Sequence, residues 1–201
     1  MAITIVSVNP SNMAESALFI TLAASIAVGL TFLFGNPKID PLWIFLPIVL
    51  LLIPGFYAAV ISGPFVPSAR KRTQAMLKLA DIKPEDTAYD LGFGDGRLIF
   101  AAAKNAKRAI GYELSIPLYL FGLLRKLVSR SKVSIRYGNI WKQDYRDADV
   151  VFCYLLPKAM VRFYKDVWPT LKPGTRVISN AFTIHEIKPI ETDDKVYLYR
   201  R

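Results

Sequence analysis

Acidic residues and glycines alternate in one short stretch of this 201-residue chain, and a further acid stands at the end of the next apolar run. Glycines are needed where a turn is tight and a ligand must approach bare backbone, because a Cβ would obstruct both. An acid roughly 20 positions after such a turn is placed to accept hydrogen bonds from ribose hydroxyls. The pattern therefore indicates a site for a ligand that contains a nucleoside. Its members are Asp90, Gly92, Gly94, Asp95, Gly96 and Glu113.

The elements that must position these residues follow from the flanking sequence. Residues 87–91 come after the helix-breaking Pro84 and form an apolar, β-prone run that predicts a buried strand. The alanine-rich run 98–103 predicts a helix, and residues 108–112 predict a second strand that leads into Glu113. This order is typical of an α/β domain with a mostly parallel sheet. The acids and glycines then gather at the carboxyl edge of that sheet.

The fine spacing distinguishes between classes of nucleoside ligand. Dinucleotide sites use G-x-G-x-x-G and hold a diphosphate on a helix N-terminus, whereas here D-x-G-x-G-x-G carries an acid before and within the glycines. Two carboxylates repel a diphosphate but attract the ammonium group of a methionine moiety. The ordered set, followed by a strand that ends in Glu, resembles motif I and the acidic position of class I S-adenosylmethionine-dependent methyltransferases. The resemblance implies a Rossmann-like domain and S-adenosyl-L-methionine as the cofactor.

Two uncharged apolar runs precede this domain, at residues 17–34 and 42–61. Each has about the length that crosses a hydrocarbon core of roughly 30 Å, and the short connection between them predicts a two-helix transmembrane hairpin. Pro47 and Pro54 are tolerated in membrane helices and also leave open a kinked or re-entrant second segment. The alternative is a pair of buried helices in a soluble protein.

The positions of the basic residues predict an orientation. Residues 1–16 contain no Lys or Arg and so lack the basic region of a cleaved signal peptide. Lys38 is the one basic residue before position 62, whereas Arg70, Lys71 and Arg72 closely follow the second run. The positive-inside rule therefore predicts that the catalytic domain and the N-terminus lie in the cytoplasm, or in the matrix of an organelle.

The net charge of +10 lies in the catalytic part of the chain. Of the 26 basic residues all but one follow residue 61, as do 14 of the 16 acids, so this part carries +11. Such a domain next to a bilayer is attracted to anionic lipid. Nucleic acid is the other usual partner for such charge, but the basic residues are scattered rather than clustered, which disfavours it. The single cysteine, Cys153, excludes an intramolecular disulfide and a cysteine-based metal cluster.

The remaining chain predicts a regular alternation of helices and strands. A proline-marked connector precedes a helix over residues 70–80, for which Ser68 is the expected N-cap. A second helix begins after Ser115, which can cap it, with Pro117 in its first turn, and runs to about residue 130. That helix is apolar on more than one face, which indicates burial against the sheet or contact with lipid or substrate. Further strands are expected at 132–137, 149–155, 176–180 and 195–199, a helix at 158–170, and a loop at 183–194.

These expectations divide the chain into four parts: an N-terminal tail at 1–16, the hairpin at 17–61, a linker with the first catalytic-domain helix at 62–81, and the methyltransferase domain at 82–201. The loop at 183–194 holds the one histidine, His185. A lone histidine on a loop usually has no chemical role, although it is the natural proton acceptor at neutral pH.

A narrower resemblance rests on several blocks together: PFVPS before motif I, DLGFGDGR, GYE, VFCYLLPKAM, and a chain end that closes on KVYLYR. With a hydrophobic segment in front, the set is similar to the membrane-anchored lysine methyltransferases that modify the c subunit of ATP synthase and the adenine nucleotide translocase, and to their prokaryotic relatives. The resemblance implies that Asn139 and Ile140 bind the adenine and that Gln74, with Pro67 and Ser68, reaches the cofactor's carboxylate. Gln74 as a solvated helix residue and Asn139 as a turn residue are the alternatives.

The acceptor side of the site is expected at the end of the strand at 149–155, where the resemblance places methyl transfer. Tyr154 and Pro157 are the candidates, Tyr154 as the wall of the acceptor channel and as a hydrogen-bonding partner of the incoming amine. A core tyrosine is the alternative. The cofactor is already activated, so positioning and a dry channel suffice, with no metal and no covalent nucleophile. The function that follows is methyl transfer to a lysine of a membrane protein, with a lipid or quinone methyltransferase and a non-catalytic membrane scaffold as rival hypotheses.

Overall fold

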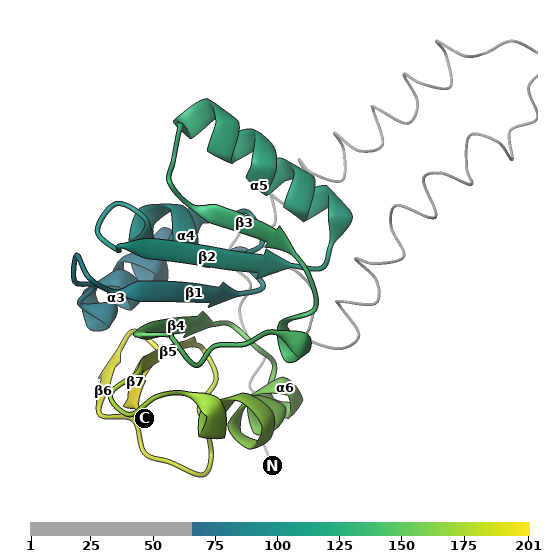
Figure 1. Ribbon diagram of the computed structural model, residues 1–201. Coiled ribbons are helices and arrows are strands. Elements are labelled where there is room, and N and C mark those ends of the chain that lie inside the picture. The colour runs from purple at the N-terminus through teal and green to yellow at the C-terminus, as the bar shows by residue number, and fades with distance from the viewer. Residues whose placement is uncertain (1–65) are drawn as a thin grey trace, which may run out of the picture. The chain divides into compact units, whose positions relative to one another are not determined.

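The computed structural model describes residues 66–201, and the predicted N-terminal tail and transmembrane hairpin lie outside this range (Figure 1). Within residues 66–201, no helix combines the length and apolarity needed to cross a membrane. The chain divides into two compact units, Met1–Leu50 and Leu51–Arg201, and only the second contains described residues.

A seven-stranded sheet with the order β3-β2-β1-β4-β5-β7-β6 forms the centre of the domain (Figure 1). Its first five strands are parallel, and β7 pairs antiparallel with both β5 and β6. The predicted α/β fold with a mostly parallel sheet is therefore confirmed. The strands are β1 (Thr87–Leu91), β2 (Arg108–Glu113), β3 (Ser134–Tyr137), β4 (Val150–Cys153), β5 (Arg176–Asn180), β6 (Glu191–Asp193) and β7 (Val196–Arg200).

The strand order reverses between β1 and β4, because β2 and β3 lie on one side of β1 while β4 and β5 lie on the other. Ligands of open α/β sheets bind outside the carboxyl ends of the strands at such a switch point. Leu91 and Cys153 pair across this point, so the residues that follow them border the same crevice. The topology thus places the glycine turn and the end of β4 next to each other.

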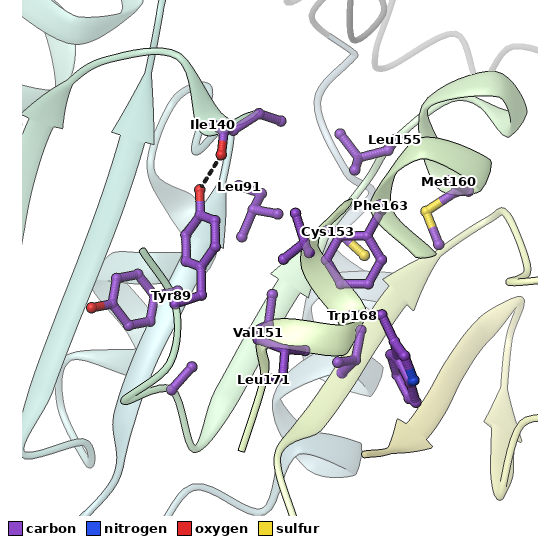
Figure 2. Close-up of a cluster of buried hydrophobic side chains, with 14 of the residues drawn as sticks. Tyr89, Leu91, Ile140, Val151, Cys153, Leu155, Met160, Phe163, Trp168 and Leu171 are labelled. Carbon is purple, nitrogen blue, oxygen red and sulfur yellow. Dashed lines mark hydrogen bonds between the residues drawn. The ribbon is translucent and has the colours of Figure 1, made fainter. Parts of the chain in front are cut away.

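Two hydrophobic clusters cover the two faces of the sheet. One joins the sheet to α3 (Arg70–Ala80) and α4 (Arg97–Ala102), and Ala88 and Phe152 point toward it. The other joins the sheet to α6 (Pro157–Arg162) and the turns after it, with Tyr89 and Val151 on that side (Figure 2). α5 (Ile116–Ser129) packs mainly on the edge strand β3. Alternate residues of each central strand therefore face opposite layers, as expected for a sheet buried on both sides.

After β4 the structure differs from the sequence predictions in two places. The helix expected over 158–170 is instead α6 followed by a π-helical turn, η2 (Phe163–Val167), and a 3-10 turn, η3 (Trp168–Thr170). Pro169 lacks a backbone N–H, so a regular α-helix cannot continue through it. The expected loop at 183–194 contains β6, which pairs with β7 through a tight hairpin at Asp194 and Lys195, both with positive φ.

Long-range contacts hold the first helix to the last parallel strand. Arg176 at the start of β5 donates to the carbonyl oxygens of Ala80 and Asp81 and forms an ion pair with Asp86. Asp86 is buried, and its carboxylate also accepts from the backbone N–H of Lys83. This cluster therefore closes the connector between α3 and β1 against β5.

Phe93 is the central packing residue of the glycine turn, and two glycines make room for it. A Cβ on Gly111 of β2 would come within 2.8 Å of the Phe93 ring, and one on Gly122 of α5 within 2.7 Å. Both distances are shorter than packed side chains tolerate. Gly122 is also the one fully buried residue of α5. The absence of side chains at these two positions lets α5 approach the turn closely.

Candidate methyl-transfer site

The glycine turn after β1 leaves room for a ligand on one side and is packed on the other. Gly92, Gly94 and Gly96 all have positive φ, between 58° and 80°, where glycine is strongly favoured. A Cβ on Gly92 would meet no atom within 4 Å, whereas one on Gly96 would lie 2.8 Å from the Phe100 ring. Gly92 therefore borders open space at the switch point, and Gly96 is required by packing.

Asp90 is the buried carboxylate of the turn. It lies near the end of β1 with 5% of its surface exposed, and its carboxylate accepts no hydrogen bond from another residue in the range 66–201. Burial raises the pKa of Asp90 to about 8, with further contributions from the charges of Glu113 and Asp95. A cationic group placed beside Asp90 would relieve this cost. The residue thus favours a ligand that carries positive charge.

Glu113 at the end of β2 is also buried but is well supplied with donors. One carboxylate oxygen accepts from the backbone N–H of Gly94 at 3.0 Å, and the other accepts from those of Leu114 and Ser115, each at 2.9 Å. Burial raises the pKa of Glu113, and the three N–H groups oppose that rise. Glu113 therefore fixes the glycine turn against the start of α5 and still has one lone pair, on the oxygen that accepts from Gly94, for a ligand hydroxyl.

Asp95 is paired within the protein, which the sequence did not predict. Its two carboxylate oxygens accept from the guanidinium of Arg97 at 2.6–3.1 Å, and one accepts from the Arg97 backbone N–H at 3.0 Å. Arg125 of α5 donates to its carbonyl oxygen at 2.8 Å. The charge expected to attract the ligand's ammonium is therefore largely neutralised at Asp95, which leaves Asp90 as the carboxylate of this turn without a cationic partner in the range 66–201.

Ser68 connects the segment before α3 to the site through hydrogen bonds to Asn180 and Arg97, and it does not cap α3. The N-cap of α3 is Ala69, without a side-chain capping bond, so the predicted capping role of Ser68 is wrong. Its hydroxyl instead accepts from the side-chain amide of Asn180 at 2.9 Å, and its carbonyl accepts from Arg97 at 2.7 Å. The competing hydrogen bond explains the lost cap. Gln74 lies on the exposed side of α3.

Asn180 is a residue of this region that the sequence did not reveal. It ends β5 at the carboxyl edge of the sheet and is fully buried, yet its side-chain oxygen has no hydrogen-bond partner among the described residues. Buried acceptors without partners are rare and indicate a missing water or ligand. Register places Asn180 on the same sheet face as Asp90, because Asp90 aligns with Phe152 and Ile178, and Asn180 lies two residues after Ile178. No sequence motif marks an asparagine at this place.

The predicted adenine-binding residues lie on the turn after β3. The side-chain oxygen of Asn139 accepts from the backbone N–H of Trp141 at 3.0 Å, so the turn-forming role is present. Ile140 is buried, and its carbonyl oxygen accepts from the hydroxyl of Tyr145 at 2.8 Å (Figure 2). Gly138 donates to the carbonyl oxygen of Glu113 at 3.0 Å, which holds this turn beside the end of β2.

The end of β4 presents an aromatic pair. Tyr154 is half-buried and stacks on Phe182 after β5, with ring centroids 6.2 Å apart. Pro157 is exposed and opens α6. Cys153 is buried among apolar side chains, and burial raises its pKa to about 12, which keeps it a neutral thiol (Figure 2). His185 is exposed in a turn beyond this pair. In residues 66–201 no group of His, Cys, Asp and Glu side chains is arranged to hold a metal.

Comparison with known protein families identifies the class of enzyme to which this domain belongs. The family described as the ANTKMT methyltransferase domain matches residues 90–191, from Asp90 to the start of β6. The chain belongs to this family. The family resemblance stated from the sequence is thereby confirmed, and the protein is an S-adenosylmethionine-dependent methyltransferase.

Several relatives support this assignment. A protein-lysine N-methyltransferase of Saccharolobus islandicus is 36% identical over 148 residues, which cover 68% of this chain and 92% of that protein. The adenine nucleotide translocase lysine N-methyltransferase of mouse is 32% identical, with 75% of this chain and 69% of that protein covered. The chain also matches a human lysine N-methyltransferase named for the C subunit of ATP synthase, with 29% identity, 59% of this chain covered and about half of that protein, 52%. It therefore lies within a family of protein-lysine methyltransferases.

A solved structure supports both the fold and the class of cofactor. An RNA methyltransferase of Salinibacter ruber, crystallised with S-adenosyl-L-homocysteine, is 32% identical and superimposes with a TM-score of 0.64, covering 67% of this chain and 93% of that one. The site of this ANTKMT family member fits the same class of cofactor: Gly92 borders open space, Asp90 favours a cation, and Glu113 has one lone pair left for a hydroxyl.

Proposed function

We propose that this methyltransferase transfers methyl groups to the side chain of a lysine in an integral membrane protein, at a position near the membrane surface. The observation that carries the proposal is the family match over residues 90–191, together with relatives whose named targets are membrane proteins. The two long apolar runs at residues 17–34 and 42–61 add a second argument, because a membrane anchor holds the enzyme where such lysines occur.

The chemistry required of the protein is positioning. Bound S-adenosylmethionine supplies a methyl group on a sulfonium, which is activated toward attack by an amine. Asp90 would hold the cationic side of the cofactor, Glu113 would accept a hydrogen bond from a ribose hydroxyl, and Asn139 with Ile140 would border its adenine. Tyr154 and Phe182 would wall the approach of the lysine. The lysine ammonium would first lose a proton to solvent, and the neutral amine would then accept the methyl group, with S-adenosylhomocysteine as the leaving group. Orientation in a site that excludes water supplies most of the acceleration.

The buried thiol of Cys153 takes no part in this reaction. Its raised pKa leaves almost no thiolate at neutral pH, and its neighbours are apolar. A direct displacement needs no covalent enzyme intermediate. Tyr154 is the polar group that the end of β4 offers to the incoming amine.

The same proposal places the catalytic domain on the cytoplasmic face of a membrane, or on the matrix face in an organelle. The support is the contrast between Lys38, alone among basic residues before position 62, and the cluster from Arg70 to Arg72. The net charge of +11 after residue 61 favours attraction of this domain to anionic lipid.

The test follows a tritiated methyl group from S-adenosylmethionine into native membranes. Wild-type protein is compared with Asp90→Ala and with Glu85→Ala. Glu85 is an exposed carboxylate just before β1, at the amino ends of the parallel strands and away from the carboxyl edge. We expect label in a membrane-protein band, lost with Asp90→Ala and kept with Glu85→Ala, and mass spectrometry then locates the methylated lysine.

Two other results would replace the proposal. Label confined to the organic extract would make the substrate a lipid or quinone, for which a membrane anchor is equally useful. Label in RNA would follow the chemistry named for the Salinibacter ruber structure and would overturn the protein-lysine assignment for this chain.

A further inference from the structure

The outer side of α5 carries an apolar stripe that the fold leaves uncovered within the described residues. Five side chains at helical spacing form it, and they account for five of the nine exposed large apolar residues in the range 66–201. We call this surface the α5 leucine stripe. Its members, with the exposed fraction of each, are Leu120 (51%), Leu123 (36%), Leu124 (58%), Leu127 (76%) and Val128 (78%).

The stripe lies opposite the side on which α5 packs. Gly122 is the helix residue that is fully buried, where a Cβ would collide with Phe93. At about 100° per residue, the mean direction of the five stripe residues lies roughly 170° around the helix axis from Gly122. The close approach of α5 to the glycine turn thus turns the leucines outward. A helix that only covered the sheet would need no apolar residues there.

The chain around the stripe is strongly basic. Residues 114–143 contain no Asp or Glu and six Lys or Arg residues. Arg125 and Arg136 are used internally, by the Asp95 carbonyl and by the Tyr112 hydroxyl. Lys126 lies about 40° around the helix axis from Gly122, on the packed side of α5. Two exposed cations lie at the end of α5 and just after it, and neither forms an ion pair with a residue in the range 66–201: Arg130 and Lys132.

We propose that the α5 leucine stripe, with Arg130 and Lys132, is a docking surface for an anionic lipid bilayer. A helix with an exposed apolar side and basic residues, lying in the plane of the interface, is a recognised mode of membrane contact. The docking surface itself is inferred independently of the substrate. Its proposed use rests on the proposed function, because docking would hold the carboxyl edge of the sheet at a constant height above the lipid in which a membrane-protein substrate lies. The attraction of the basic domain to anionic lipid is thereby assigned to one element, α5.

Other occupants match the stripe less well. A second copy of the chain would bring two sets of cations together. The chain's own residues 1–65 are rich in apolar side chains, but they contain two acids, Glu15 and Asp40, against the six basic residues around α5. An anionic bilayer matches both the apolar and the charged parts of the surface.

The experiment uses the full chain, reconstituted in nanodiscs of phosphatidylcholine alone or of phosphatidylcholine with phosphatidylglycerol. A nitroxide label is attached to Leu124→Cys or, as the control, to Ile190→Cys. Ile190 is an apolar residue of similar exposure, 63%, that precedes β6 at the opposite edge of the sheet. Cys153 is buried, so labelling is selective for the introduced thiol. Accessibility to oxygen and to a water-soluble nickel chelate then reports whether each label lies in lipid or in water.

We expect the label at position 124 to enter lipid in the anionic discs and that at position 190 to stay in water. Replacing Arg130 and Lys132 by Glu should return the label at 124 to water, because each cation near an anionic surface contributes a factor of about five to partitioning and the two together contribute about 25-fold. Retained binding of S-adenosylmethionine verifies that this variant is folded.

Two results would overturn the inference. One is a label at 124 that remains in water in both kinds of disc. The other is a label shielded equally in detergent micelles and in both discs, unaffected by the charge reversals, which would assign the stripe to the chain's own apolar segments. Methyl transfer to detergent-solubilised membrane protein is measured in parallel. Its absence in wild-type protein would refute the proposed substrate without bearing on the α5 contact.

Discussion

The raised pKa of Asp90 predicts that cofactor affinity falls steeply as the pH is lowered. In the proposed site the cofactor's ammonium would pair with the ionised carboxylate, whereas burial and the neighbouring charges of Glu113 and Asp95 keep Asp90 protonated up to about pH 8 in the free protein. Binding must therefore expel a proton. Below the pKa of the free protein, each pH unit should weaken binding about tenfold, or by about 1.4 kcal/mol.

The magnitude follows from the fraction of protein whose Asp90 is ionised. With a pKa of about 8, that fraction is roughly one in ten at pH 7 and one in a hundred at pH 6, so the dissociation constant should rise about tenfold between these values. The range is kept below about pH 7.5, because the cofactor's own α-amino group titrates near pH 7.7–8.0 and would produce an opposing limb.

Isothermal titration of S-adenosylmethionine at several pH values, in buffers with different heats of ionisation, measures both the affinity and the proton release. Asp90→Asn is the control, since it keeps the shape and removes the titration. It should bind more weakly at pH 7.5 and show little dependence on pH. An affinity that is flat from pH 6 to 7.5 in wild-type protein, or an equal slope in Asp90→Asn, would refute the reasoning.

Four further outcomes are expected. Asp90→Asn should stabilise the cofactor-free protein by a few kcal/mol at about pH 8 and little at about pH 4 in denaturant titrations, because a carboxyl whose folded pKa is raised loses its stabilising contribution as pH rises. Gly122→Ala should lower the free energy of unfolding by about 1–3 kcal/mol through collision with Phe93, despite its better helix propensity; no loss would contradict the packing. Asn180→Ala should raise the dissociation constant of the cofactor about tenfold, as expected for one hydrogen bond to a charged group, and an unchanged constant in calorimetry would assign its free oxygen to water. Tyr154→Phe keeps the stacked ring, so steady-state kinetics should show a lower kcat with an unchanged cofactor constant, whereas equal kcat would remove the hydroxyl from the reaction.

The sequence predicted the part of the site that depends on local geometry. The strand, glycine turn and helix from residues 87 to 103 lie where the pattern placed them, because tight turns and buried strands demand particular residue types within a few positions. The place of Glu113 at the end of the second strand follows from the same local rules, whereas the strand order was not predicted, because it depends on pairing between distant segments.

Features that depend on distant partners were not predictable in this way. The hydroxyl of Ser68 has the chemistry of an N-cap, and nothing nearby in the sequence reveals that Asn180 uses it instead. The pairing of Asp95 with Arg97 is local, but it is not evident from the sequence, because the alternation of acids and glycines favours the ligand's ammonium as the partner of the Asp95 carboxylate. Gly111 and Gly122 do carry a detectable sign: glycine inside a strand or a helix often marks close packing, here around Phe93.

The bond between Ser68 and Asn180 has a consequence for the order in which this enzyme is assembled during synthesis. The residues proposed to bind the cofactor, from Asp90 to Glu113, are close together in the chain. Asn180 follows Ser68 by 112 positions, and at about 5–20 residues per second it leaves the ribosome on the order of 10 s later. For this time the segment before α3 of a nascent chain lacks its partner on β5. Docking of that segment through Ser68 therefore awaits the synthesis of β5.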